Sequence, residues 1–500
     1  MRDLAFIATL LALLPLAVAR PFAGVLLWCW ISFMNPHRLV WGSASEMPWA
    51  VAVFGATLLG CLLAREPRRF QPNALMALFA MLAIAVTLTS LAALAPPEAV
   101  WAKWERTVKV IAGLLLTAAL LNDRWRVHAL VWVVVVSLGY FGVRGGLFTV
   151  LTGGAHKVLG PPDTMITDRN HLAAALLIGL PMMNYLRLHS AHRVVRVGLA
   201  VAMALTLMAV LGSHSRGGLL GLVAVAGVFW LRSRRKLAGA AVLAVALSAG
   251  VAFMPAHWVE RMNGIATAAE EDASASTRLV LWGVSWKLAL DRPLTGSGFA
   301  GPYTREVVDR VAPGGPARAV HSIWFEFLGE HGFPAFAVWL SVSGVALLYA
   351  RRLARLPADR PDLAWARDLG RMAQVSVVAY AVSGTFLSLS YWDLYWTLLV
   401  AVGAAHALAM RALREGAGAA VAVPSTPARG WRGDTAAIPA GPRPPPAGDP
   451  VAAAAPGDRP VGWRGRAAVP SRPDAGAGWR TGRGRVEGDP RPPRDEEVPA

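Results

Sequence analysis

The chain has 500 residues, of which 55% are hydrophobic and 16% are charged, whereas a soluble protein has about 25% charged residues. Its formal net charge of +18 would suit a nucleic-acid-binding protein. The arginines, however, stand in short segments between apolar runs and in the C-terminal part, which is how membrane proteins place them. The composition therefore excludes a soluble globular protein with a nucleic-acid partner and predicts a membrane protein.

Apolar runs recur from the N-terminus to about residue 410 and predict an all-α fold, a polytopic membrane helical bundle of about 12 transmembrane helices in one domain, residues 1–410. The first run is interrupted at Arg20-Pro21, so it counts as one span or as two. The runs occupy residues 4–34, 49–63, 73–95, 108–121, 127–150, 171–186, 194–212, 217–231, 237–254, 323–349, 374–389 and 393–410.

Basic segments orient these spans. Arg232–Lys236 is the strongest basic loop, and lysine and arginine favour the cytoplasmic side of a membrane. The other strongly basic segments fall on the same side by alternation. The opposite side then receives residues 35–48, 96–107, 151–170, 213–216, 255–322 and 390–392.

The largest external loop, residues 255–322, contains a predicted helix at Thr277–Leu290, which Asp291-Arg292-Pro293 ends. Trp282 and Trp286 are four residues apart and share one face of this helix. An amphipathic helix that carries tryptophan is expected at the bilayer surface. The glycine-rich Gly296–Phe299 that follows predicts a turn, and its spacing is no dinucleotide fingerprint.

The C-terminal part, residues 411–500, is rich in alanine, proline, glycine and arginine and lacks apolar periodicity. Such a composition cannot bury enough apolar surface to fold. We therefore expect a disordered cytoplasmic tail.

His321 stands where a polar, arginine-rich segment ends and an apolar helix begins. A helix N-terminus carries partial positive charge and unpaired N–H groups, so it suits an anionic ligand. The same field disfavours a proton on a nearby imidazole and keeps the histidine available as a base. The alternative is a capping or interface histidine.

Several basic residues share the predicted external side, against the positive-inside trend. Taken singly, an arginine there is explained by snorkelling to lipid headgroups. Taken together with a histidine, they resemble a clamp for a diphosphate, because arginine presents a planar donor fork to phosphate oxygens. The external set comprises Lys103, Arg106, Arg169, His171, His214, Arg216, Arg278 and His321.

Two glutamates, Glu326 and Glu330, follow His321 on the predicted helix, one turn apart. They are either a buried pair with arginine or backbone partners, or they orient His321 or a neighbouring arginine. No nucleotide motif and no group of residues at metal-ligand spacing faces this side. We therefore expect a reaction on a pre-activated substrate, without ATP, metal or another cofactor.

Three stretches resemble the O-antigen ligase and O-antigen polymerase superfamily, over about residues 1–410: Ser215–Gly218, Arg278 with Trp282 leading to Asp291–Phe299, and His321–Gly332. Four others look like the branch of exosortase A-associated O-glycosylation ligases: Met1–Leu4, Arg20–Phe22, Asn35–Arg38 and Asp168–Leu172. One departure is Ser322, where asparagine commonly follows the histidine.

The resemblance implies a glycosyltransferase fold of the membrane-embedded C type in the bacterial inner membrane, serving lipopolysaccharide biosynthesis or O-glycosylation. It implies a glycan donor on undecaprenyl diphosphate and an acceptor hydroxyl, of lipid A core or of a protein Ser/Thr, on the periplasmic face. It also implies His321 as the catalytic base and Arg216 and Arg278 as diphosphate ligands. The wider expected substrate-binding set adds Arg169, His171, His214, Glu326 and Glu330.

Two other functions stay open. An O-antigen-type polymerase that joins repeat units uses the same donor, so the sequence separates it poorly from a ligase. A polysaccharide or lipid transporter would hold ionisable residues near the bilayer midplane. Spans such as 73–95, 237–254 and 374–389 carry no Asp, Glu, Lys or Arg, which favours chemistry at the external ends.

Overall fold

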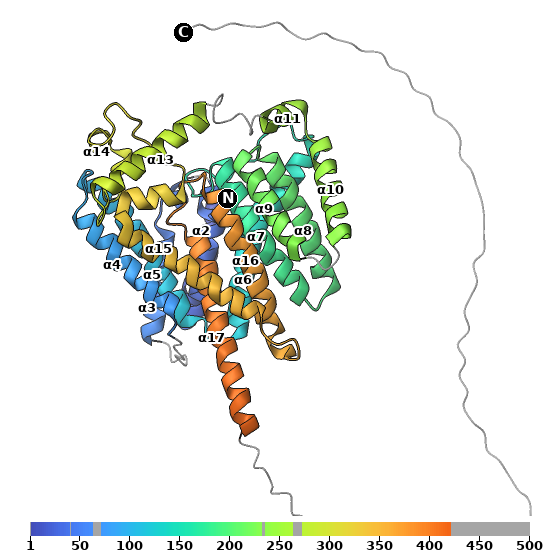
Figure 1. Ribbon diagram of the computed structural model, residues 1–500. Helices are drawn as coiled ribbons and strands as arrows, with labels where there is room; N and C mark the ends of the chain where they lie inside the picture. Colours follow the sequence, from blue (N-terminus) through green and yellow to red (C-terminus); the bar gives the residue numbers. More distant parts are fainter. Residues whose placement is uncertain (1, 41, 64–71, 233–235, 264–272, 422–500) are drawn as a thin grey trace, which may run out of the picture. The chain divides into compact units, whose positions relative to one another are not determined.

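The computed structural model describes residues 2–40, 42–63, 72–232, 236–263 and 273–421 (Figure 1). All regular secondary structure in these ranges is helical, which confirms the all-α class. Within the described ranges, two shorter apolar helices, α2 (Pro21–Met34) and α3 (Trp49–Leu63), accompany seven that are long and apolar enough to cross a membrane. The seven are α1 (Arg2–Ala19), α4 (Ala74–Leu91), α6 (Arg124–Leu151), α7 (Arg169–His189), α8 (Arg193–Gly212), α15 (Ile323–Ala354) and α17 (Asp393–Val421). The protein is thus a multi-pass membrane protein, and the count of about 12 spans stays a prediction.

Local sequence signals start several of these helices. The side chains of Asn73, Asp123 and Asp168 accept hydrogen bonds from backbone N–H groups in the first turns of α4, α6 and α7. Asn and Asp are preferred at this position because they satisfy N–H groups that have no partner within the helix. The predicted spans 73–95, 127–150 and 171–186 therefore begin within about three residues of the observed helices.

The N-terminal apolar run forms two helices that fold back on each other. Phe6, near the start of α1, packs against Trp30, near the end of α2, and against Trp49, at the start of α3. At the other end of the hairpin, Gly60 of α3 faces the Val18 carbonyl of α1. The start of α1 and the 35–48 segment therefore lie at the same end of the bundle, and the run counts as two helices.

The centre of the bundle is α7, whose residues from Leu172 to Met183 are all buried. It packs against α6, α8, α9 (Arg216–Arg232) and α16 (Ala364–Gly384). Glycines let α6 and α8 approach closely, since a Cβ at Gly146 would lie 2.0 Å from the Leu205 carbonyl oxygen. Small residues at such contacts are how helices associate within membranes.

The large loop after α10 (Lys236–Phe253) lies at one end of the bundle (Figure 1). It includes α11 (Ala256–Asn263), α13 (Ala273–Asp291), η3 (Gly301–Tyr303) and α14 (Arg305–Val308). Helix α13 contains the predicted helix Thr277–Leu290 and ends at Asp291, as expected. Its Trp282 is half-buried and stacks on Phe325 of α15, whereas Trp286 is exposed. The position of helix α13 at a bilayer surface stays a prediction.

Helix α15 consists of two helical parts separated by Gly332, whose φ of 70° and ψ of −176° are not helical. The glycine-rich turn packs at this break. The N–H groups of Ser297 and Gly298 donate to the carbonyls of Gly329 and Glu330, at 2.9 and 2.8 Å. These carbonyls stand at the end of the first part of the helix, where no intrahelical donor remains. The predicted turn therefore caps the short helix from Ile323 to His331.

Three predicted boundaries are wrong. Helix α5 begins at Pro97, so residues 97–107 are helical and not a loop. Helix α16 ends at Gly384, so residues 385–389 lie outside the helix, although periodicity placed them in the span 374–389. Helix α17 continues to Val421, past the expected start of the tail at 411. The rest of the predicted tail, residues 422–500, lies outside the described residues, as do residues 264–272 of the loop.

The break at Gly332 generates a stability prediction. A Cβ there would lie 2.6 Å from the Pro293 carbonyl oxygen, on a backbone with positive φ. We therefore expect Gly332→Ala to lower the stability of the folded protein by about 1–3 kcal/mol. Gly344, later in α15, has open space around it, and Gly344→Ala should be neutral or stabilising by up to about 1 kcal/mol. Thermal unfolding of both variants in detergent measures the difference, and equal melting temperatures would contradict the role given to Gly332.

Candidate functional site

A cavity of about 840 Å³ lies at the loop end of the bundle. Its walls come from α2, η1 (Pro36–Leu39), α5, the segment 163–166, α15 and the segment that joins α16 to α17. Its volume is within the range of small-molecule binding sites, about 300–1,000 Å³. Its polar and charged lining includes Lys103, Arg106, Glu326, Ser388, Tyr391 and Asp393.

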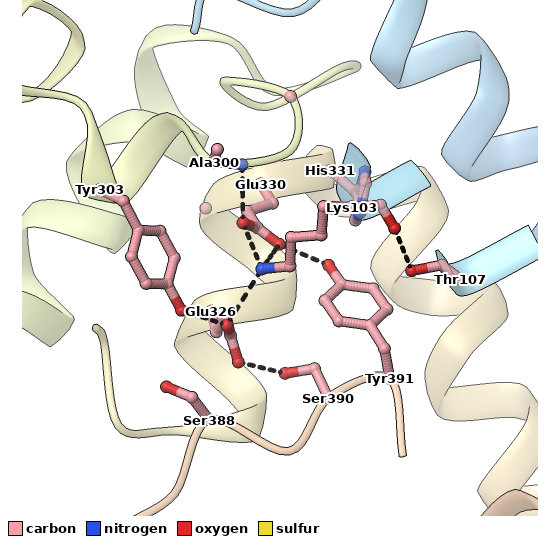
Figure 2. Close-up of polar contacts among 12 residues, drawn as sticks. Lys103, Thr107, Ala300, Tyr303, Glu326, Glu330, His331, Ser388, Ser390 and Tyr391 are labelled. Carbon is pink, nitrogen blue, oxygen red and sulfur yellow. Dashed lines mark hydrogen bonds and ion pairs between the residues drawn. The ribbon is translucent and has the colours of Figure 1, made fainter. Parts of the chain in front are cut away.

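Lys103 forms an ion cluster with the two glutamates of α15 (Figure 2). Its Nζ lies 3.2 Å from Glu326 Oε1 and 2.8 Å from Glu330 Oε1. Both carboxylates are buried, with side chains 3% and 0% exposed, while the lysine side chain is 25% exposed. Of the two sequence alternatives for the glutamates, the structure shows a buried pair, but its cation is a lysine from α5 and not an arginine.

Further donors satisfy the carboxylate oxygens, as Figure 2 shows. The hydroxyls of Tyr303 and Ser390 donate to Glu326 at 2.6 and 3.0 Å. The Tyr391 hydroxyl and the Ala300 N–H donate to Glu330 at 2.6 and 3.0 Å. Burial, and then the neighbouring carboxylates, raise the pKa of the Tyr303 phenol, so that this tyrosine stays a protonated donor. Each carboxylate is therefore held in a single orientation.

Aromatic rings complete the surroundings of Lys103. Its Nζ lies 5.0 Å from the ring centroids of Tyr303 and Tyr391 and 5.8 Å from that of Phe299. Such cation–π contacts strengthen when the cation is shielded from water. The cluster thus joins α5, the first part of α15, the 299–303 segment and the segment after α16.

His321 lies directly before the N-cap residue of α15, which is Ser322. The predicted place of His321 at the junction of polar segment and helix is therefore confirmed. Its backbone has a φ of 52°, a conformation that costs energy for a residue with a Cβ and often marks a functional site. The His321 N–H donates to Ser388 Oγ at 3.0 Å, and Ser388 lines the cavity. His321 is thus held beside the cavity by the segment that follows α16.

The charge environment favours a neutral His321. Burial, and next the Arg278 guanidinium, lower the pKa of His321 below its usual value of 6.5. Glu326 and Asp168 act in the opposite direction, and Arg318 lowers the pKa of His321 further. An imidazole with a lowered pKa is unprotonated at neutral pH and can accept a proton.

The start of α15 next to His321 presents buried polar groups. Ser322 is fully buried, and its hydroxyl has no hydrogen-bond partner among the residues that the structure describes. Its side chain makes no capping hydrogen bond, although serine usually makes one at this position. Buried polar atoms without partners are rare and costly. A donor and acceptor is therefore available at the helix N-terminus, beside the proposed base.

Contacts through Trp282 and Phe386 link α13, which carries Arg278, and the start of α9, which carries Arg216, to the segment before His321. One turn after Arg278 on α13, Trp282 donates to the Val320 carbonyl, next to His321, at 3.2 Å. The Trp282 ring also lies 6.2 Å from that of Phe386. The start of α9 also approaches Phe386, because a Cβ at Gly217 would lie 3.8 Å from the Phe386 Cβ.

His214 and Arg216 lie in and directly after the tight turn between α8 and α9. The His214 Nε2 hydrogen-bonds with the Gly154 carbonyl at 2.9 Å, and its ring stacks on His257. Arg216 donates to the Arg261 carbonyl at 2.9 Å, and Arg261 donates to the His214 carbonyl at 3.1 Å. His214 is 2% exposed, and burial lowers its pKa. The ring of His214 is therefore used to hold the turn that carries Arg216.

His171 and Arg169 are both at the start of α7, but they lie near different parts of the site. His171 belongs with His321, and Arg169 belongs with His214. His171 is within electrostatic range of His321 and Glu326, and its Nε2 is buried with no hydrogen-bond partner in the described part of the chain. Arg169 is instead within electrostatic range of His214. The structure thus brings His171, Arg278, Glu326 and His321 together, and it places Arg169 with His214 and Arg216.

Sequence reasoning missed four residues of this site. Tyr303 was unassigned, Ser388 was placed at the end of an apolar span, and Ser390 and Tyr391 were placed in a short external segment with no role. The sequence did contain a signal for Ser388, Ser390 and Tyr391. Two serines and a tyrosine just before Asp393 are unusual at the end of a span, and polar residues within a membrane region usually have a function. Lys103 was placed on the external side, but nothing in the sequence paired it with glutamates more than 200 residues away.

The fold and the site define a class: an all-α membrane protein with a charged, partly buried site at one end. Comparison with family models then gives two matches. Residues 201–340 match the O-antigen ligase family, and residues 1–191 match a family of unknown function, DUF5935. Residues 201–340 therefore belong to the O-antigen ligase superfamily, a group of membrane glycan ligases and polymerases. A search of curated proteins gave no match.

The ion cluster predicts that replacing two different lysines of α5 lowers the unfolding free energy by unequal amounts. Lys103→Met leaves two carboxylates buried without their cation, so we expect a loss of about 3–5 kcal/mol in unfolding free energy. The matched control is Lys109→Met, which removes an exposed pair with Glu105 and should cost less than about 1 kcal/mol. Adding Glu326→Gln and Glu330→Gln to Lys103→Met should recover part of the loss. Chemical unfolding in detergent tests this, and equal losses for the two lysine variants would rule out the assigned role of Lys103.

Proposed function

We propose that this protein is a glycan ligase of the bacterial inner membrane. It transfers an oligosaccharide or polysaccharide from undecaprenyl diphosphate to an acceptor hydroxyl on the periplasmic face, with inversion at the anomeric carbon and without metal or ATP. The acceptor is lipid A core or a protein Ser/Thr. The observation that carries the proposal is the position of His321: within the matched residues 201–340, hydrogen-bonded to Ser388 of the cavity wall and within electrostatic range of Arg278.

His321 is the proposed catalytic base. The acceptor hydroxyl gives its proton to the imidazole as its oxygen forms a bond to the anomeric carbon of the donor sugar. The bond from that carbon to the diphosphate oxygen breaks at the same time, and the diphosphate keeps the electron pair. Removal of the proton by a positioned base is worth roughly 10²–10⁴ in rate.

Arg216 and Arg278 are the proposed ligands of the diphosphate. Negative charge builds on the bridging oxygen as the diphosphate leaves, and positioned guanidinium groups stabilise that charge. The contacts through Trp282 and Phe386 support this role, because they bring the starts of α9 and α13 towards the residue before His321. The free N–H groups of the first turn of α15 add partial positive charge there.

The cavity of about 840 Å³ is the proposed place of the sugar units next to the scissile bond. Lys103, Glu326 and Tyr391 on its wall belong to the ion cluster, so their orientations are fixed before substrate binds. We assign Glu326 and Glu330 the task of positioning this wall, and His171 that of a second polar group facing the reacting atoms.

A polymerase that joins repeat units is the alternative, because the family match covers both activities. The two differ in the acceptor, which is the same glycan for a polymerase and another molecule for a ligase. Mass analysis of the glycoconjugate lost on deleting the gene separates them. A transporter is not favoured, because the match is to a family of ligases.

The roles predict a kinetic difference. His321→Ala removes a group that acts in the transition state, so it should lower kcat about 100-fold or more and keep donor binding. Arg278→Ala and Arg216→Ala should also weaken donor binding, by about 1.5–3 kcal/mol for a lost charge-assisted hydrogen bond. Donor binding and turnover of purified, monodisperse variants test this, with Arg310→Ala, an exposed arginine of the same loop, as control. Wild-type turnover by His321→Ala would transfer the base role to His171.

The lowered pKa of His321 predicts the pH dependence of turnover. A base must be unprotonated, so the rate should rise with pH and level off above the pKa of His321, which lies below 6.5. Arg278→Gln removes a positive charge that lowers this pKa, so the acid limb of its pH–rate profile should move to higher pH. A limb that stays in place or moves to lower pH would contradict the proximity of Arg278 to the base.

The orientation of the protein in the membrane can be tested at the two ends of helix α15. Gly314 is in the large loop and Ala358 follows α15, so the two positions lie at opposite ends of this helix. Insertions of a reporter that is active only in the periplasm should give signal at Gly314 and none at Ala358. The reverse pattern would place the proposed site on the cytoplasmic face.

A further inference from the structure

A second cavity, of about 510 Å³, lies beside the first and contains a basic cluster. Its cations come from four separate elements: Arg2 from α1, Arg38 from η1, Arg144 from α6 and Lys157 from the loop after α6. Among the described residues that line the cavity, the one carboxylate is Asp163, which also lines the larger cavity. We call this cavity the basic pocket.

The positive charge of the basic pocket is poorly compensated. Asp163 pairs with Arg38 at 3.7 Å, but its side chain is 78% exposed, so the pair is weak. Arg144 and Lys157 form no ion pair with any residue that the structure describes. Gathering four like charges around one cavity costs free energy, and an anion bound there would offset it.

The loop that carries Lys157 and Asp163 is held in place by its own hydrogen bonds. The Val158 N–H donates to the Gly212 carbonyl at 2.9 Å, and the Gly160 N–H donates to the Thr167 carbonyl at 3.2 Å. The Thr167 hydroxyl donates to the Pro161 carbonyl at 2.7 Å. The cations are therefore presented on a built wall, as a binding site requires.

Apolar side chains stand next to the cations. Phe141, Phe148 and Leu159 line the pocket, and the last two are 41% and 62% exposed. Phe148 and Arg144 both lie on α6, a helix long and apolar enough to cross a membrane, one turn apart. A ligand can thus place a charged head among the cations and an apolar chain along the exposed face of α6, which a free inorganic anion cannot do.

We propose that the basic pocket is a second anion-binding site, which takes the phosphate of a lipid phosphate monoester while Phe148 and Leu159 contact its chain. All of its cations lie within residues 1–191, the part of the chain that matches a family of unknown function. The site shares no lining residue with the set His321, Arg216 and Arg278, so binding there does not depend on the proposed transfer reaction.

The test measures binding of farnesyl phosphate to the full chain in detergent by calorimetry. Farnesol, which lacks the phosphate, should bind at least tenfold more weakly, and inorganic phosphate should not compete at equal concentration. Arg144→Glu with Lys157→Glu should weaken binding at least tenfold, because two favourable charges become repulsive. Arg310→Glu, a charge reversal on an exposed residue of the large loop, should leave binding unchanged.

Three outcomes would overturn the proposal. Wild-type affinity in the Arg144→Glu, Lys157→Glu variant would show that the pocket does not bind the probe. Equal affinity for inorganic phosphate would assign the site to free phosphate. Binding that Arg278→Ala abolishes and the double variant keeps would place the probe at the proposed catalytic site. If charge reversal prevents folding, Arg144→Gln with Lys157→Gln replaces it, with the same outcomes on a smaller scale.

Discussion

Two carboxylates buried one helical turn apart are tolerated only if a cation and further donors reach them. In this protein Lys103 supplies the cation, and two tyrosines, a serine and one backbone N–H supply the donors. The lysine and these donors come from three separate segments, so satisfying the glutamates fixes the register of α5, the first part of α15 and the segment after α16. That last segment also holds His321, through Ser388. The position of the proposed base therefore depends on a charge pair that does no chemistry itself.

The same cluster joins the two parts of the chain that match separate families. Lys103 lies in residues 1–191, and the glutamates lie in residues 201–340. The larger cavity likewise has walls from both parts. Residues 1–191 therefore contribute one wall of the candidate site and the cation that neutralises the two glutamates. The break at Gly332 separates the short helix that carries these glutamates from the rest of α15.

The sequence predicted the class of fold and most helices well, because apolar runs and caps are local. Asn73, Asp123 and Asp168 start helices near where the pattern placed them. Sequence reasoning also placed His321 correctly, since a polar segment that meets an apolar helix is visible in the chain. The predicted end of α16 at residue 389 was wrong. Residues 385–389 are apolar enough for a span, but Ser388 and the following Ser390 and Tyr391 contact distant partners outside the helix. The ion pair of Glu330 and the hydrogen bond that caps the helix at Gly329 join segments that are far apart in the sequence. Hydrophobic periodicity carries no information on such contacts.

The most direct test of the proposed base is the pH–rate profile of His321→Ala compared with that of the wild type, at saturating donor. If the imidazole takes the acceptor proton, its removal should lower turnover and abolish the acid limb below pH 6.5, leaving a residual rate that is flat in this range. An acid limb that persists at the same pH in His321→Ala would show that another group titrates, and it would contradict His321 as the base.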